Sequence, residues 1–109
     1  TPDQPSLDGM HMVIGVYNEI LADERLNPYL KFLGCLITRV ENDIINKSYI
    51  GLIEEEFGAY VIKPYIRKNT KLNQSASMHK DIFTHDPDGR GAKEYREAAK
   101  EILIRAEQE

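Results

Sequence analysis

The chain has 109 residues, of which 41% are hydrophobic and 29% charged, a composition typical of one small soluble domain or of a piece of a larger one. Its formal net charge of −4 excludes attraction of nucleic acid to the whole surface, so such binding requires a local patch. We expect neither a membrane span nor a secretory signal, because no apolar run approaches the roughly 18 residues that cross a bilayer. The single cysteine, Cys35, cannot form an internal disulfide, which favours a reducing cytoplasm.

The first half of the chain predicts a helix, a buried strand and a second helix. Apolar residues recur at three- and four-residue spacing over residues 7–22, as on an amphipathic helix. A nearly continuous apolar run over residues 30–40 follows, which predicts a strand covered on both faces, as in a parallel sheet. Asn42 or Asp43 then caps a second helix, which ends at Gly58.

The second half predicts a strand, a loop and a helix. The strand lies in "AYVIKPYI", where Pro64 removes a donor from the ladder and should weaken pairing. A polar loop over residues 65–80 precedes a helix that begins near Asp88 or Gly91 and runs nearly to the end. The order helix, strand, helix, strand, loop, helix predicts an α/β fold with parallel crossovers. Because two strands alone are marginally stable, we expect further strands outside this chain.

The loop is unusual for an acidic chain, because residues 58–80 contain no Asp or Glu. Its cations are Lys63, Arg67, Lys68, Lys71 and Lys80. A solvated connection is the commoner explanation of such a loop. Alternatively, Arg67, Lys68 and Lys71 meet an anion while Asn69 presents its amide to a flat heteroaromatic edge. The chemistry of the residues leaves both interpretations open.

Other kinds of site are not indicated. The histidines have no His or Cys partner at metal-ligand spacing, so we predict no metal ligand. Cys35 lies within the first predicted strand, where a cysteine is a small buried hydrophobe rather than a nucleophile. The chain contains neither G-x-x-x-x-G-K-[ST] nor G-x-G-x-x-G, so it offers no phosphate-binding loop. We therefore predict no catalytic residue in this chain.

The stretch "IRKNTKLNQSAS", followed by "HKDIFTHDPDGRGAKEYREAAKEIL", resembles the C-terminal stretch of ParA-type partition ATPases. Their usual form is I-P-R-N-V-R-L-x-E-A-P-S, then G-K, then Y-D-P-x-x-x-G-A. Upstream, "LNPYLKFLGCLITRV" is similar to a strand of the same family, so the resemblance covers nearly the whole chain. The chain departs from the pattern where Arg67 and Ala76 replace prolines and His79 replaces a glycine.

The resemblance implies that residues 1–109 form a single piece, the C-terminal part of a P-loop NTPase-like parallel sheet flanked by helices. Its cofactors would be ATP and Mg²⁺ in the complete protein. The phosphate-binding loop of this deviant Walker A class, and the Mg²⁺ ligands, would lie N-terminal to the chain. We expect no ATP hydrolysis from the chain alone, because phosphoryl transfer depends on that loop and its metal.

The resemblance also assigns candidate site residues. The family's turn beside the adenine base corresponds to Ile66, Arg67, Lys68 and Asn69. The basic position of N-x-[RK]-L corresponds to Lys71 and implies sequence-independent DNA binding by ATP-bound dimers. A second basic position of the family falls near Asn42, which is uncharged, and Lys47 is the candidate to replace it.

The implied function is plasmid or chromosome segregation by a homodimer in the cytoplasm, associated with the nucleoid. The implied partners are non-specific DNA and a ParB-type centromere-binding protein. The resemblance implies no association with a membrane. One alternative is a MinD-type membrane-associated ATPase, although the tail "EILIRAEQE" ends acidic and lacks Phe and Trp. Another is a non-catalytic fragment that associates with itself through exposed strands.

Overall fold

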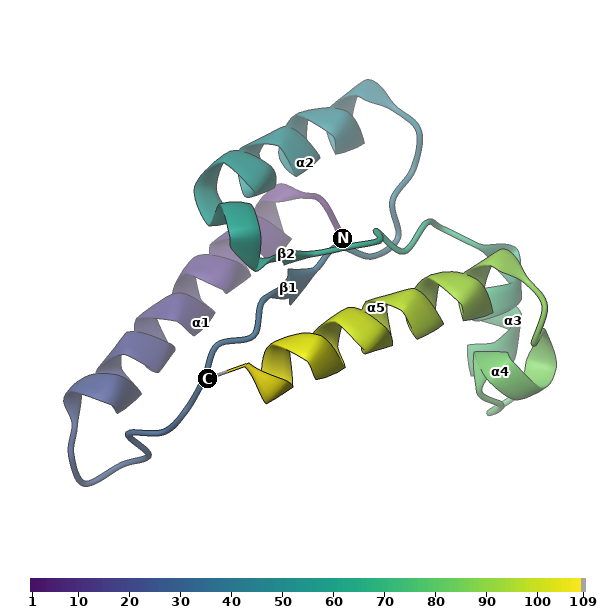
Figure 1. The fold of residues 1–109 in the computed structure, drawn as a ribbon. Coiled ribbons are helices and arrows are strands. Elements are labelled where there is room, and N and C mark those ends of the chain that lie inside the picture. The colour runs from purple at the N-terminus through teal and green to yellow at the C-terminus, as the bar shows by residue number, and fades with distance from the viewer. Residues whose placement is uncertain (109) are drawn as a thin grey trace.

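The computed structural model describes residues 1–108 and has an α/β architecture, as the sequence predicts (Figure 1). A parallel pair of short strands lies between helices. In chain order the elements are α1 (Gln4–Ala22), β1 (Cys35–Leu36), α2 (Ile44–Phe57), the 3-10 turn η1 (Gly58–Tyr60), β2 (Val61–Ile62), α3 (Thr70–Ser77), α4 (Ile82–His85) and α5 (Arg90–Glu107).

The two strands are each only two residues long, much shorter than the apolar runs that predicted them. They pair in parallel with Cys35 opposite Val61 and Leu36 opposite Ile62. Pro64 follows β2 closely and cannot donate to a ladder, in agreement with the weak pairing expected there.

Parallel contact resumes beyond Pro64, in the segment that was predicted to be loop. The amide of Ile66 donates to the carbonyl of Ile37 at 2.9 Å, and the amide of Lys68 donates to the carbonyl of Val40 at 2.9 Å. Val40 and Arg67 form an isolated parallel bridge. The backbone of residues 66–68 is therefore positioned by the chain that follows β1.

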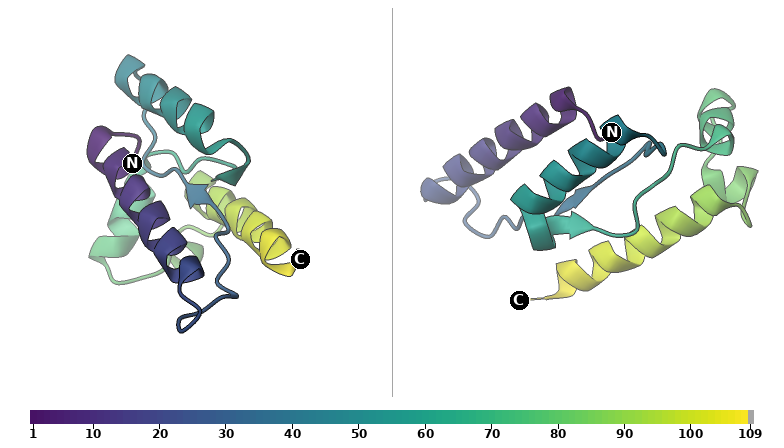
Figure 2. Two further views of the ribbon diagram at one scale, coloured as in Figure 1. Left: turned by 90° about the vertical axis from the view of Figure 1, so that its left-hand side faces the viewer. Right: turned by 90° about the horizontal axis from the view of Figure 1, so that it is seen from above.

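Helices cover both faces of the strand pair, as the predicted two-sided burial requires (Figure 2). Side chains alternate between the two faces along each strand, so Val61 packs on one side and Ile62 on the other. The cluster beneath α1 and α2 contains Leu7, Ile37, Ile53, Phe57 and Val61. The cluster beneath α5 contains Ile62, Ile66 and Ala98.

The second helix has the ends that the sequence predicts. The carboxylate of Asp43 accepts a hydrogen bond from the amide of Asn46 at 2.7 Å, which identifies Asp43 as the N-cap. Gly58 closes α2 with a φ of 50°, in a region that glycine adopts without the steric cost of a side chain. The helix bounds were therefore readable from local capping chemistry.

The prediction of an entirely irregular loop over residues 65–80 was wrong, because α3 lies within it. Asn69 caps the first turn through its side-chain oxygen. The helix ends in a Schellman arrangement, in which the amide of Lys80 donates to the carbonyl of Ser75 at 2.9 Å. His79 takes the left-handed position of this arrangement, with φ 54°, which costs about 1 kcal/mol relative to glycine. The family pattern has glycine at this position.

The buried face of α5 includes a charged side chain. Ala92 and Ala98 are buried, whereas Ala99 and Ala106 are exposed. Glu94 is buried on the same face with only 8% of its surface exposed. The sequence pattern missed it because an acidic residue is normally assigned to the solvent side of a helix.

Arg105 connects the C-terminal half of α5 by hydrogen bonds to the backbone near the start of both strands. Its guanidinium donates to the carbonyls of Leu33 at 2.9 Å, Tyr60 at 3.1 Å and Val61 at 3.2 Å. Its Nε donates to Glu101 at 2.9 Å, and only 17% of the side chain is exposed. One side chain thus satisfies carbonyls on both strand segments.

Gly34 allows its backbone to lie close to the carbonyl of Tyr60 and the guanidinium of Arg105. Its φ is 149°, and a Cβ there would lie 2.3 Å from the carbonyl oxygen of Tyr60 and 2.6 Å from the guanidinium of Arg105. The position therefore requires glycine, both for its backbone angle and for the close contact with the carbonyl of Tyr60.

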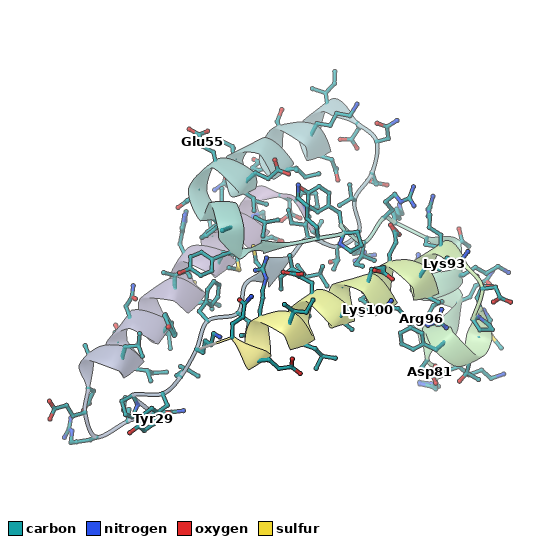
Figure 3. The ribbon with its side chains drawn as sticks, viewed as in Figure 1. Tyr29, Glu55, Asp81, Lys93, Arg96 and Lys100 are labelled. Carbon is teal, nitrogen blue, oxygen red and sulfur yellow. The ribbon has the colours of Figure 1, made fainter. Side chains whose placement is uncertain are left out.

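We predict that Arg105→Ala lowers the free energy of unfolding of the chain by about 2–4 kcal/mol, because it leaves the carbonyls of Leu33 and Val61, in partly buried contacts, and the exposed carbonyl of Tyr60 without a charged donor. Urea denaturation followed by circular dichroism measures the change. Lys100→Ala is the matched control on α5 (labelled in Figure 3), since it removes only an exposed pair with Glu97 and should cost under about 1 kcal/mol. Equal effects of the two substitutions would contradict this role for Arg105.

Candidate functional site

Two cavities flank residues 66–69, at the carboxyl ends of the two parallel strands. Ligands of open α/β sheets bind at this edge, outside the carboxyl ends of the strands. The smaller cavity has a volume of about 230 Å³, and the predicted adenine-side residues all line it together with Thr38 and Arg39 from the segment after β1. These adenine-side residues are Ile66, Arg67, Lys68 and Asn69.

The larger cavity is a groove of about 940 Å³ between α2 and the same loop. Its floor is partly apolar, with Val40, Ile50 and Tyr65 among the lining residues. The hydroxyl of Tyr65 is buried and has no hydrogen-bond partner among the described residues. The cations that line the groove are Lys47, Arg67, Lys68 and Arg90, and the acids are Glu41 and Glu54. Positive charge therefore predominates in the groove.

Ile66 lies in the core rather than at the surface, with 1% of its area exposed. Its side chain packs in the cluster beneath α5, and its amide and carbonyl bond to Ile37 and Val40. It lines the smaller cavity as part of the cavity wall. Any contribution of Ile66 to a ligand site therefore comes through shape and not through a polar contact.

Arg67 and Lys68 are both paired with acids. The Nε of Arg67 donates to Glu94 at 2.9 Å, and its backbone amide donates to the same carboxylate at 3.3 Å. The Nζ of Lys68 lies 2.9 Å from Glu41, in a pair exposed to solvent on both sides. An exposed pair of this kind is weak and exchanges readily with another anion, whereas the Arg67 contact ends on a buried carboxylate.

Asn69 joins the loop to α3. Its side-chain oxygen accepts from the amide of Lys71 at 2.9 Å, which leaves its amide nitrogen without a hydrogen-bond partner among the described residues. This nitrogen is the group of Asn69 that can still donate to a ligand in the smaller cavity.

The two predicted DNA-binding lysines both lie in the first turns of helices. Lys47 is in the first turn of α2 and lines the groove, while Lys71 is in the first turn of α3 and does not line it. Over residues 1–108, neither lysine has a carboxylate within ion-pair distance. The structure thus brings Lys47 together with Arg67 and Lys68, but Lys71 lies apart from that groove.

Cys35 has the environment of a structural thiol. Burial raises the pKa of its side chain above the ordinary value, and the nearby charge of Arg105 offsets only part of that effect. A raised pKa reduces the thiolate fraction at neutral pH and therefore the nucleophilicity. In the part of the chain that the structure describes, no group of three His, Cys, Asp or Glu residues is placed to hold a metal ion. None of the described helices is both long and apolar enough to cross a bilayer.

Sequence reasoning missed the residues that shape the site from outside the loop. Glu94 and Arg90 on α5 reach the loop, and Thr38 and Arg39 form the opposite wall of the smaller cavity. Arg39 has a φ of 55°, which is unusual for a residue with a side chain, and it lies between Ile37 and Val40, whose backbones both bond to the second segment. The one signal in the sequence that could have indicated these residues was Glu94, an acid on the same face of the last helix as Ala92 and Ala98.

Comparison with known proteins supports the resemblance seen in the motifs. No family model matches the chain. It is 29% identical over 104 residues to the chromosome-partitioning ATPase Soj of Thermus thermophilus, an alignment that covers 94% of this chain and 41% of that protein. It is also 29% identical over 98 residues to the sporulation initiation inhibitor protein Soj of Bacillus subtilis, covering 89% of this chain and 38% of that protein.

A protein of Mycobacterium tuberculosis without an assigned function is 29% identical over 101 residues, covering 92% of this chain and 31% of that protein. The resemblance to ParA-type partition ATPases is thus confirmed along nearly the whole chain. The chain spans well under half the length of the curated relatives that it matches.

Proposed function

We propose that residues 1–109 are the C-terminal part of a ParA-like ATPase domain that acts in plasmid or chromosome segregation. The name of one relative, the chromosome-partitioning ATPase Soj, supports this assignment, and a second relative shares the name Soj. In the proposal the chain contributes adenine-side nucleotide contacts and non-specific DNA binding. The phosphates and Mg²⁺ would be bound by residues outside this chain, which has no phosphate-binding loop of its own.

The observation that carries the nucleotide part is the position of residues 66–69. They line one small cavity at the carboxyl ends of parallel strands, the edge at which nucleotides bind in open α/β sheets. In the proposal Asn69 donates from its free amide nitrogen to a ring nitrogen of adenine. Ile66 and the backbone of Arg67 and Lys68 form the wall against which the base lies.

Exposed surface supports the idea that the domain continues beyond this chain. The outer side of α1 carries Met12, Val13 and Val16 with 73%, 51% and 55% of their areas exposed. The sheet has only two strands in the described residues, so each keeps one unpaired edge. A longer parallel sheet would cover both features. Self-association of a non-catalytic fragment would cover them too and is the second candidate function.

The coding sequence upstream of Thr1 distinguishes the two candidates. We predict a K-G-G-x-x-K-[ST] motif there and Mg²⁺-dependent ATP hydrolysis by the whole gene product. Replacing the final Lys of that motif by Ala should abolish turnover, because the phosphates lose their main cation. A gene product that has no such motif and hydrolyses no ATP would refute the ATPase and leave the self-associating fragment.

The DNA-binding part of the proposal rests on the lysines that have no carboxylate partner among the described residues. Lys71 and Lys47 occupy first helical turns, where backbone amides add partial positive charge. Arg67 is occupied by Glu94, so its charge is less available to a phosphate. We propose that Lys71 contacts the DNA backbone and that Lys47 assists it. A homodimer, a ParB-type centromere-binding partner and a nucleoid-associated cytoplasmic location belong to the same proposal.

We predict that Lys71→Glu weakens binding of the ATP-loaded gene product to random-sequence duplex DNA. Fluorescence anisotropy at several salt concentrations measures the effect. The slope of log K against log salt is negative, and each lost phosphate contact makes it less steep by about 0.9. Lys100→Glu makes the same charge change on α5 and should bind as the parent does. If both variants bind equally, Lys71 has no such role.

A further inference from the structure

We propose that Glu94 is a positioning residue for the nucleotide site, because it fixes the backbone of residues 66–69 from the buried face of α5. The functional half of this inference rests on the proposed adenine contact. The structural half, that Glu94 determines the conformation of the loop, stands on the geometry alone and is tested separately below.

Glu94 contacts both the side chain and the main chain of Arg67. One carboxylate oxygen accepts from Nε at 2.9 Å and the other from the backbone amide at 3.3 Å. The Glu94 side chain is 10% exposed and the Arg67 side chain 53%. The carboxylate is thus inside the protein while most of the arginine remains at the surface. The pair therefore attaches an otherwise exposed loop residue to the buried face of α5.

A second contact from the same end of α5 extends this attachment by one residue. The Nη2 of Arg90 donates to the backbone carbonyl of Lys68 at 3.1 Å, and the Nε of Arg90 lies 3.9 Å from Glu94. Glu94 thereby binds Arg67 directly and stabilises the guanidinium that binds Lys68. The backbone amide of Arg67 and the backbone carbonyl of Lys68 are thus both hydrogen-bonded to side chains of α5.

The burial of the Glu94 carboxylate costs free energy of folding, and the bonds to Arg67 offset this cost. Glu94 is 8% exposed, and burying a carboxylate disfavours folding unless the charge is paired and hydrogen-bonded. Arg67 also lacks the ring that restricts φ in the family's proline. Among residues 1–108 the amide of Arg67 donates to Glu94 alone, whereas the adjacent amides of Ile66 and Lys68 bond to the chain after β1. A proline at this position would therefore break no bond of the parallel ladder.

The position of the loop between the two cavities determines how its conformation affects ligand binding. Arg67 and Lys68 line both the smaller cavity and the groove, so a shift of their backbone changes both. A loop that is in the binding conformation only part of the time binds with an affinity reduced by that fraction. Loss of Glu94 should therefore weaken nucleotide binding without removing any group that touches the nucleotide.

The first experiment measures the affinity of the whole gene product for mant-ADP, a fluorescent adenine nucleotide. We expect Glu94→Ala to weaken binding about tenfold, the loss that follows if the loop is correctly placed one tenth of the time. Glu94→Gln should weaken it less, since its amide oxygen still accepts from Arg67. Glu97→Ala is the matched control, because this acid lies one turn further along α5 and forms only an exposed pair with Lys100.

Rescue by proline separates positioning from general destabilisation. Arg67→Pro alone removes both hydrogen-bond donors of the buried carboxylate and leaves it only Arg90 at 3.9 Å, so this variant should also bind poorly. The double variant Arg67→Pro, Glu94→Ala removes the charge and restricts φ again, so its affinity should return to within about twofold of the parent. Independent, additive losses in the two variants would overturn the proposal, since residues that act together are not additive.

Hydrogen exchange without nucleotide tests the structural half by itself. The amide of Lys68, which donates to Val40, should exchange at least tenfold faster in Glu94→Ala and at the parent rate in Glu97→Ala. Unchanged exchange would show that Glu94 does not fix the loop. If the parent binds no mant-ADP but exchange accelerates as expected, the proposed adenine contact is wrong and the positioning of the loop by Glu94 stands.

Discussion

The contact between α5 and the strand segments is the interaction on which the rest of the structure depends. Two strands of two residues each cannot stabilise a sheet through their ladder. Arg105 binds carbonyls where the strand segments begin, and Glu94 binds the amide of Arg67 beyond their carboxyl ends. The apolar contacts of Ala98 and Ile62 lie between these two polar attachments. Helix α5 therefore fixes the second strand segment along its length. The position of this segment in turn determines the position of the loop that follows it.

This arrangement divides the basic residues of an acidic chain into two groups. Arg67, a cation within the predicted adenine turn, pairs with a buried carboxylate that also accepts from its backbone amide. Lys71 and Lys47 stand in first helical turns with no carboxylate partner among the described residues, so their charge is available at the surface. A net charge of −4 is compatible with DNA binding only if such cations are concentrated on one side. The proposed nucleotide and DNA contacts then share one loop and its neighbouring helices.

Much of the architecture could be predicted from the sequence, because it depends on local signals. Apolar periodicity located the long helices, and the caps at Asp43 and Gly58 are short-range chemistry. The helix within the loop was missed because its residues are polar and its C-terminal turn uses His79 where glycine would have signalled an end. Glu94 could not be predicted as part of the site, because its partner lies 27 residues away and becomes a neighbour only after folding. The family resemblance gave residues 66–69 as candidate site residues, but it did not predict the contacts that position them.

Photoaffinity labelling with 8-azido-ATP tests the central claim, that residues 66–69 lie beside the adenine base. The azide is on the base itself, so the crosslink reports where adenine binds and not where the phosphates bind. Irradiation of the whole gene product, followed by chymotryptic digestion and mass spectrometry, should locate the label within residues 66–72 or at Thr38 and Arg39. Excess ATP should suppress it. Competable labelling confined to other parts of the protein would contradict the account.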